Sequence, residues 1–331
     1  MDKIDFVLLW VDGNDPEWQK EKNKYSPKKI DYSTGDNRFR DWDNLRYWFR
    51  GVEKFAPWVN DIYFVTWGHL PEWLNTDHPK LKIIKHIDYI PEKYLPTFNS
   101  NTIETNLHRI DGLSEHFVLF NDDVFLTDDV SEEDFFIDGN PCDSYVESLI
   151  APVGNGSKIT HIKANNTDLI NAHFNKREVH KKYRSKIYNV KYGLQNFITL
   201  YFLPFSYFTG FRNPHIATSL LKSTYEKVWK LEEEVLDASC MNKFRGYNEV
   251  SHWLMRYWDL CEGNFVPRSI KFGRYFEIKE KNEDLCSFIE NHKAKVICMN
   301  DMSTDIDFER AKKEINSAFD KILPDKSGFE K

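Results

Sequence analysis

The chain has 331 residues, which is enough for one large α/β domain or two modest ones. Its formal net charge of −7 leaves no basic excess to displace counterions, which argues against nucleic acid as the main partner. The five cysteines are widely spaced and show no metal-ligand spacing, which indicates a reducing compartment and no zinc site. We expect neither a signal peptide nor a membrane span, because no stretch approaches the ~20 apolar residues that a span needs.

Strands and helices are expected to alternate through the first half of the chain. Helical spacing predicts a helix over 41–56. A capping pattern formed by Asn101 and Glu104 predicts a second over 101–110, and the polar stretch 19–36 is expected to be a mobile loop. Strands are expected at 4–10, 62–67, 81–85 and 117–121. Strands separated by helices favour an α/β fold with a Rossmann-like, mainly parallel sheet flanked by helices.

The second half is expected to be more helical. Periodic apolar residues predict helices over 218–235, 250–261 and 307–322. Proline and glycines cluster near 151–157, where we expect a flexible boundary between the two halves of the chain. The predicted organisation is a Rossmann-like half with the nucleotide-sugar and metal motifs, a helical half that completes the active site, and a frayed tail, together forming one integrated catalytic domain. The corresponding ranges are 1–150, 151–323 and 324–331.

Acidic or amide residues follow three apolar runs. The run 117–121 opens onto Asp122 and Asp123, the N-terminal strand leads through Trp10 to Asp12, and the run 296–299 opens onto Asn300 and Asp301. Open α/β sheets bind ligands at the carboxyl ends of their strands, and paired carboxylates there suit a Mg²⁺ or Mn²⁺ ion that bridges phosphate oxygens. The sequence therefore predicts a metal site at this edge.

Three basic side chains and one histidine are candidates for contacts with phosphate. Arg38 and Arg46 lie in an arginine-rich segment, and Arg245 precedes a predicted helix, where backbone N–H groups favour anions. His215 lies in a loop before a predicted helix and could act as a general base or a phosphate ligand, although a satisfied polar histidine is the commoner case.

An aromatic run at 197–208, interrupted by Pro204, is the longest apolar stretch. Its plainest interpretation is buried core. The alternative is a surface that contacts a membrane or a glycan chain.

Taken together, these stretches resemble the Stealth family of sugar-phosphate transferases, which includes bacterial capsule enzymes and the animal lysosomal-enzyme N-acetylglucosamine-1-phosphotransferase. The second of the family's four regions is the longest and most specific match, because it includes Asn37-Arg-Phe-Arg-Asp41 and Asn121-Asp-Asp-Val124. The four regions are similar to 4–18, 37–124, 214–249 and 297–301. Without the extra domains of the animal enzyme, the chain looks like a bacterial capsule or cell-wall version.

The resemblance implies a reaction and assigns roles to residues. A nucleotide-sugar, such as a UDP-hexose or UDP-HexNAc, would give its sugar-1-phosphate to a hydroxyl of a glycan or sugar-phosphate polymer, releasing nucleoside monophosphate. The implied catalytic residues are Asp123, His215 and Arg245. The implied nucleotide-sugar contacts are Trp10, Asp12, Arg38, Arg46 and Glu249, although Asp would be expected at 249 as readily as Glu. The implied ligands of Mg²⁺ or Mn²⁺ are Asp122, Asp123, Asn300 and Asp301.

Two other functions compete with this interpretation. A metal-dependent glycosyltransferase would share the fold, the metal and the donor, but would release nucleoside diphosphate. A non-catalytic glycan-binding module would use the acidic residues only as structural caps and would need no metal. An aspartyl-nucleophile phosphatase fits poorly, because neither acidic turn has the DxDxT pattern. The expected location is cytoplasmic, with peripheral contact at the inner face of the membrane left open, and the oligomeric state is unknown.

Overall fold

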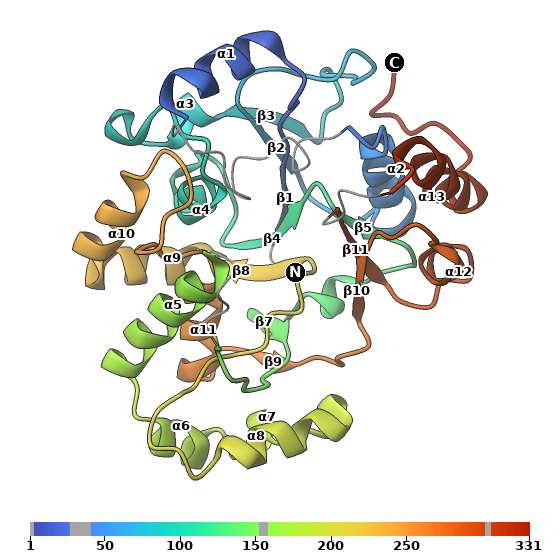
Figure 1. Cartoon of the computed structure of the whole chain (residues 1–331). Coiled ribbons are helices and arrows are strands. Elements are labelled where there is room, and N and C mark those ends of the chain that lie inside the picture. The colour runs from blue at the N-terminus through green and yellow to red at the C-terminus, as the bar shows by residue number, and fades with distance from the viewer. Residues whose placement is uncertain (1–2, 27–40, 152–157, 302–305) are drawn as a thin grey trace.

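The computed structural model describes residues 3–26, 41–151, 158–301 and 306–331. Its central sheet has five strands in the order β3-β2-β1-β4-β8 (Figure 1). The first four pair in parallel, whereas β8 pairs with β4 in the antiparallel sense. The strands are β1 (Ile4–Leu9), β2 (Ile62–Thr66), β3 (Leu81–Lys85), β4 (His116–Asn121) and β8 (Thr218–Leu221). The predicted mainly parallel sheet of a Rossmann-like α/β fold is therefore confirmed.

Two smaller sheets lie beside the central one. The first has the order β10-β11-β5 and contains β5 (Val124–Leu126), β10 (Gly273–Glu277) and β11 (Val296–Asn300). The second has the order β6-β7-β9 and contains β6 (Phe136–Ile137), β7 (Asn140–Asp143) and β9 (Val266–Pro267). Only two residues separate β4 from β5, so the chain passes from the central sheet into the first small sheet at Asp122 and Asp123.

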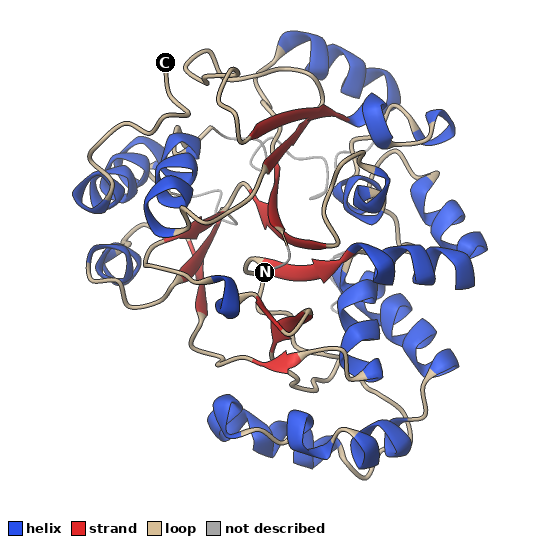
Figure 2. Cartoon of the chain, turned by 180° about the vertical axis from the view of Figure 1, so that it is seen from behind, coloured by secondary structure: helices blue, strands red, loops and turns tan. Residues whose placement is uncertain are grey.

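Helices cover both faces of the central sheet, with α2, α12 and α13 on one side and α4, α9 and α10 on the other (Figures 1 and 2). None of the helices within the described residues is both long and apolar enough to cross a bilayer. The α-helices are α1 (Pro16–Tyr25), α2 (Leu45–Phe55), α3 (His86–Tyr89), α4 (Ser100–Thr105), α5 (Ile159–His173), α6 (Lys176–Lys182), α7 (Arg184–Ile187), α8 (Asn196–Phe202), α9 (Lys222–Leu231), α10 (Glu233–Cys240), α11 (Trp253–Glu262), α12 (Glu283–Glu290) and α13 (Phe308–Ile322). The 3₁₀ turns are η2 (Glu92–Tyr94), η3 (Leu107–Arg109), η4 (Glu132–Asp134) and η5 (Val190–Gln195).

The apolar core forms two clusters, one on each face of the sheet. Successive side chains of a strand point to opposite faces, so Phe6 and Leu8 of β1 lie in one cluster and Val7 lies in the other. Each cluster takes residues from both halves of the chain, since the first includes Phe319 and the second includes Trp258. The proposed division near residue 151 stays a prediction, and 152–157 lie outside the described residues.

The stretch 19–36 was expected to be a loop, and its first part is helical instead. Helix α1 begins at Pro16 and ends at Tyr25. Its start is stabilised by Asp15, which accepts a hydrogen bond from the Trp18 N–H, and by Pro16 in the first turn. Trp18 is buried, which anchors this polar helix. The rest of the stretch, from 27 on, lies outside the described residues.

The helix predicted over 218–235 is confirmed from Lys222 on, with a break between α9 and α10 at Glu232, but its first four residues are not helical. The residues Thr218–Leu221 form β8, which adds an antiparallel edge to β4, and helices α9 and α10 follow it. Leu220 and Leu221 fit helical spacing, but pairing with β4 decides the conformation of this short apolar run. The predicted helix over 101–110 is α4 followed by the 3₁₀ turn η3, and the cap is Asn99 rather than Asn101.

The tail after Pro324 is packed, not frayed. Phe329 is buried, and Arg50 forms a bidentate ion pair with Glu330, at 2.7 Å from Nε and 2.8 Å from Nη2. Leu74 pairs with Glu330 in an isolated bridge. Arg50 is therefore a buried anchor for the C-terminus.

Candidate active site

The antiparallel strand β8 brings His215 to the carboxyl end of β4. Leu119 of β4 pairs with Thr218 at the beginning of β8, so the residues just before β8 lie at the edge where β4 ends. His215 precedes β8 by three residues, and Asp123 follows β4 by two. A backbone φ of 48° at His215 turns the chain there.

A second strand reaches the same point from the C-terminal part of the chain. Cys298 of β11 pairs with Val124 of β5, and the Met299 N–H donates to the Asp123 carbonyl at 2.8 Å. The end of β11, which includes Asn300, and the next residue, Asp301, therefore run alongside the acidic turn. The structure brings together the three segments that carry Asp123, His215 and Asn300.

The two oxygens of the Asp123 carboxylate have different surroundings. Oδ2 lies 3.3 Å from His215 Nε2 and accepts a hydrogen bond from the Cys298 thiol, also at 3.3 Å. Oδ1 is buried and has no hydrogen-bond partner. One potential ligand atom each from Asp123, His215 and Cys298 lies within 4.8 Å of the others. Because a buried carboxylate oxygen without a partner is costly, Oδ1 is suited to a cation.

Burial and the charge of Asp123 set the pKa values of its two neighbours, and they oppose one another at His215 but reinforce one another at Cys298. Burial alone would lower the pKa of His215, but the hydrogen bond and the negative charge of Asp123 outweigh it and raise that pKa above its ordinary value. Burial, reinforced by the charge of Asp123, raises the pKa of the Cys298 thiol well above its ordinary value. Cys298 therefore keeps its proton and donates a hydrogen bond to Asp123. Because a neutral thiol is a weak metal ligand, Cys298 is a poor candidate to hold a cation.

These contacts fit a hard divalent cation better than a soft one. Asp123 Oδ1 offers an oxygen, and the exposed Asp122 adds a second carboxylate beside it. The Asn300 side chain donates through Nδ2 to the Tyr275 hydroxyl at 3.0 Å, which leaves its carbonyl oxygen as the ligand atom. Coordination by these residues and by Asp301 remains a prediction.

Arg245 lies in a cluster of polar side chains near the pair of Asp123 and His215. Its Nη2 donates to Ser100 Oγ, and its buried Nε has no hydrogen-bond partner. The charges of Arg245 and Glu104 both act on His215. Glu104 is buried and accepts from His252 Nδ1 at 2.6 Å. Arg245 thus retains N–H groups for an anion in a neighbourhood that contains the candidate base.

Glu249 holds the loop that carries Arg245. Its side chain is fully buried, and its carboxylate accepts from Asn99 at 3.0 Å, from Asn101 at 2.7 Å and from the Gly246 N–H at 2.5 Å. Burial raises the pKa of Glu249, although these donors oppose the effect. The observed contacts of Glu249 are structural, and its predicted contact with the nucleotide-sugar stays a prediction.

The turn after β1 lies at the same edge of the sheet, because β1 is parallel to β4 and adjacent to it. Trp10 stacks on Phe64 and meets the edge of His69, while the Asp12 N–H donates to His69 Nε2 at 2.7 Å. Burial lowers the pKa of His69, which fits a neutral ring that accepts at Nε2. Phe64 and His69 thus fix the position of the Trp10 ring, and the roles of Trp10 and Asp12 stay predictions.

The two remaining arginine candidates have different outcomes. Arg38 lies outside the described residues. Arg46, in the first turn of α2, forms an ion pair with Asp43 at 3.4 Å and lies over the Trp73 ring. A phosphate contact by either arginine stays a prediction.

Sequence reasoning missed several residues of this neighbourhood. Cys298 could have been found, since it precedes Asn300 by two positions in a strand and therefore shares its face. Glu104 was interpreted as part of a helix cap, and His252 had no distinguishing signal among the 11 histidines. The contact between Glu104 and His252 spans 148 residues, so only the fold reveals it.

Similarity to characterised proteins extends along the whole chain. Residues 2–30 match Stealth protein conserved region 1, and 38–142 match Stealth protein conserved region 2. A capsular polysaccharide phosphotransferase, WcwK of Streptococcus pneumoniae, is 43% identical over 100% of this chain and 99% of its own length. The exopolysaccharide phosphotransferase cps2G of Lactiplantibacillus plantarum is 42% identical over 99% of this chain and 96% of its own length.

Solved structures give a more distant likeness. The apo bifunctional glycosyltransferase WbbM is 9% identical with a TM-score of 0.38, over 97% of this chain and 52% of that chain. The galactosyltransferase LgtC, in complex with donor and acceptor sugar analogues, is 10% identical with a TM-score of 0.37, over 95% of each chain. The full-length relatives are sufficient to assign the chain to the Stealth family of phosphotransferases, which makes it an enzyme of the transferase class.

Proposed function

We propose that this enzyme transfers a sugar-1-phosphate from a nucleotide-sugar to a hydroxyl of a glycan, in the synthesis of a capsular or other cell-surface polysaccharide. The observation that carries the proposal is full-length similarity, at 42–43% identity, to polysaccharide phosphotransferases. The reaction forms a phosphodiester between the sugar and the acceptor. The leaving group is nucleoside monophosphate, because the bond that breaks joins the two phosphorus atoms through oxygen.

The arrangement around Asp123 supports this chemistry. A Mg²⁺ or Mn²⁺ ion held by Asp122 and Asp123, with Asn300 and Asp301 nearby, would supply positive charge to the diphosphate of the donor. The partnerless Oδ1 of Asp123 is the atom that we assign to this contact. Its Oδ2 stays engaged with His215 and Cys298, so the two functions do not compete for one oxygen.

His215 is suited to accept the proton of the acceptor hydroxyl. When Nε2 donates to Asp123, the imidazole is held in the tautomer whose Nδ1 carries a lone pair. The proton of the hydroxyl would move to that nitrogen as the new bond to phosphorus forms. Asp123 then stabilises the imidazolium through the same hydrogen bond.

Arg245 would neutralise charge on the transferred phosphoryl group. Its Nη2 is fixed by Ser100, and its buried Nε lacks a hydrogen-bond partner. A guanidinium with a fixed plane binds phosphate oxygens in bidentate fashion, and such donors contribute most where charge develops. Trp10 and Asp12 at the neighbouring strand end would contact the nucleotide.

Analysis of the nucleotide product tests the proposal. The full chain would be incubated with Mg²⁺, a panel of UDP- and GDP-sugars, and a capsule-type oligosaccharide. We expect release of UMP or GMP, together with a phosphodiester-linked product, and loss of both with EDTA. Release of UDP or GDP would instead identify a glycosyltransferase, which breaks the bond between sugar and phosphate. Tight glycan binding without nucleotide release would identify a binding module.

A further inference from the structure

The segment 190–207, which includes most of the aromatic run that was expected to be buried core, presents an exposed apolar surface instead. Nine of the sixteen exposed large hydrophobic side chains in the described ranges fall between 190 and 207. Val190 is 90% exposed, Leu194 80%, Tyr201 72% and Phe197 67%. The nine residues are Val190, Leu194, Phe197, Ile198, Leu200, Tyr201, Leu203, Phe205 and Tyr207, and we call them the apolar face. Apolar surface of this extent usually marks a contact with a partner.

Basic residues accompany the apolar face. Between 176 and 207 the chain has seven lysines and arginines against a single acid, Glu178, although the whole protein has a net charge of −7. Five of these basic residues are exposed: Arg177, Lys181, Lys182, Arg184 and Lys191. Four of them lie on α6 and α7, and Lys191 lies in the 3₁₀ turn η5. Helices α6 and α7 lie with α8 in one layer at an end of the molecule (Figure 1).

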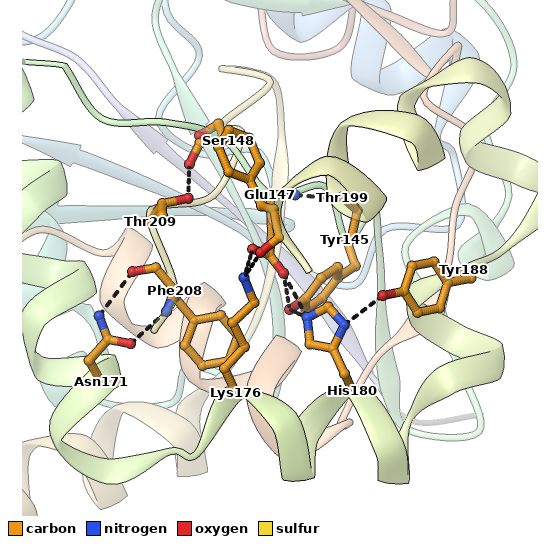
Figure 3. Close-up of polar contacts among 11 residues, drawn as sticks. Tyr145, Glu147, Ser148, Asn171, Lys176, His180, Tyr188, Thr199, Phe208 and Thr209 are labelled. Carbon is orange, nitrogen blue, oxygen red and sulfur yellow. Dashed lines mark hydrogen bonds and ion pairs between the residues drawn. The ribbon is translucent and has the colours of Figure 1, made fainter. Parts of the chain in front are cut away.

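A buried ionic network fixes this layer to the body of the protein (Figure 3). Glu147, which is fully buried, lies 2.6 Å from both Lys176 Nζ and His180 Nε2 of α6. Lys176 also donates to the Phe202 carbonyl at 2.7 Å, and the Glu147 N–H donates to Thr199 Oγ1 at 3.3 Å, which ties α8 to the same carboxylate. A layer held in this way presents its outer side chains on a rigid support.

We propose that the apolar face and its basic neighbours form a docking surface for an anionic lipid bilayer. Interfacial segments combine Phe, Tyr and Leu, which enter the boundary between headgroups and acyl chains, with Lys and Arg, which attract anionic headgroups. Both components occur here on adjacent elements. The proposal does not depend on the reaction proposed above, because it concerns adsorption alone.

The charges favour a bilayer over other occupants. A second copy of the chain bound through the same face would place the exposed basic residues of two subunits near one another, which is unfavourable. A neutral glycan could stack on the aromatic rings but would gain nothing from the basic residues. A sugar-phosphate polymer could meet both the rings and the charges, but it would leave the exposed aliphatic side chains of Val190, Leu194 and Leu203 in water. An anionic bilayer satisfies both components at once.

Docking would also set the position of the active site relative to the membrane. The chain continues from α8 through Phe208 and Phe211 into the loop that carries His215. Asn171 fixes the Phe208 backbone through two hydrogen bonds, of 2.8 and 3.0 Å, and Arg256 holds the Arg212 carbonyl at 3.1 Å. The segment between the docking surface and the candidate base is therefore fixed to the body of the protein.

Vesicle flotation with the full chain tests the proposal. Vesicles of phosphatidylglycerol mixed equally with phosphatidylcholine are compared with vesicles of phosphatidylcholine alone. We expect the protein to float with the anionic vesicles and to be released by high salt. The double variant Phe197→Ser/Tyr201→Ser should bind at least about tenfold more weakly, because two exposed rings no longer enter the interface. Lys181→Glu/Lys182→Glu should lose a similar factor on anionic vesicles.

Matched control variants distinguish binding through this surface from non-specific adsorption of the protein to vesicles. Ile87 is 73% exposed on α3, so Ile87→Ser removes a comparable apolar group elsewhere, and Lys230→Glu/Lys313→Glu reverses two exposed charges elsewhere. Both controls should bind vesicles like the unmodified protein. Absence of flotation, or equal binding by the test and control variants, would overturn the proposal. Conversion of a dimer to a monomer by the ring substitutions, without vesicle binding, would identify a second copy as the occupant.

Discussion

His215 and Asp123 are separated by 92 residues, yet His215 Nε2 lies 3.3 Å from Asp123 Oδ2. This contact connects the candidate base to the candidate metal ligand through one carboxylate. Loss of either side chain should therefore affect the other, and the two substitutions are not expected to be independent.

Asp123→Asn should abolish turnover while leaving the fold intact. The amide is neutral, so it removes the charge that would hold the cation and stabilise the protonated His215. Turnover is measured as release of nucleoside monophosphate at increasing Mg²⁺, and folding by thermal unfolding. The control is Asp128→Asn, an exposed carboxylate at a neighbouring turn, which should behave like the unmodified enzyme. Near-normal turnover of Asp123→Asn would refute the assignment to the metal.

His215→Asn should lower kcat by about 10²–10⁴-fold, the usual contribution of a general base. Asn is preferable to Ala here, because the φ of 48° lies in the left-handed region that Asn tolerates. The base must be neutral, and the pKa of His215 is raised, so activity should fall as pH decreases through a value above 6.5. This acidic limb should be missing from the residual activity of the variant. A loss below about threefold would argue against base catalysis.

Glu249→Gln should lower kcat more than it raises the KM for the nucleotide-sugar, because the Arg245 that its loop carries is assigned to charge that develops in the transition state. Three donors converge on the carboxylate, and the amide of Gln would place its own N–H groups against one of them. The loop of Arg245 would loosen, and we expect kcat/KM to fall about tenfold. Initial rates over a range of donor concentrations separate the two parameters. The control is Asn248→Ser, a substitution at an exposed residue of the same loop. An equal loss of kcat/KM in this control would contradict the proposed positioning role of Glu249.

Glu330→Gln should lower the free energy of unfolding by about 3 kcal/mol, because it leaves the buried Arg50 without its charged partner. Burial would raise the pKa of Glu330, but Arg50 outweighs it and holds the pKa below the ordinary 4.5. The stabilisation is therefore present above pH 4.5 and is lost as pH falls through the lower value of the folded state. Urea unfolding at neutral and acidic pH measures it.

Two outcomes of that experiment are decisive. The curves of Glu330→Gln and the unmodified protein should converge in acid, while Asp325→Asn, an exposed change in the same tail, should have no effect at any pH. A constant difference at all pH values would show that the lost contact is not ionic.

The parallel part of the fold was predictable because its strands are unusually clear in sequence. The apolar runs that become β1, β2 and β4 are each followed by turn or loop residues, whereas β3 leads directly into α3. β8 was missed because four residues cannot distinguish a strand from the first turn of a helix. The same contrast holds for the site. Asp122 and Asp123 could be predicted because they follow an apolar run, but the contact of Cys298 with Asp123 depends on pairing between β11 and β5.

The packed tail shows a different limit. Residues beyond Pro324 have a polar composition typical of a frayed end, and only Phe329 suggests otherwise. Its position against His78, with ring centroids 3.7 Å apart, and the ion pair of Glu330 arise from partners about 250 residues earlier. Local pattern contains no information about such partners.

The strands that meet at Asp123 also constrain how the protein can fold. Asp123 is supplied by the first half of the chain, His215 by the middle and Cys298 by the last tenth, so this site has a high contact order. A ribosome would have to release residues beyond β11 before the carboxylate meets its neighbours. Until then the acidic turn stays solvated, and the nascent chain should be unable to take up the cation or begin turnover.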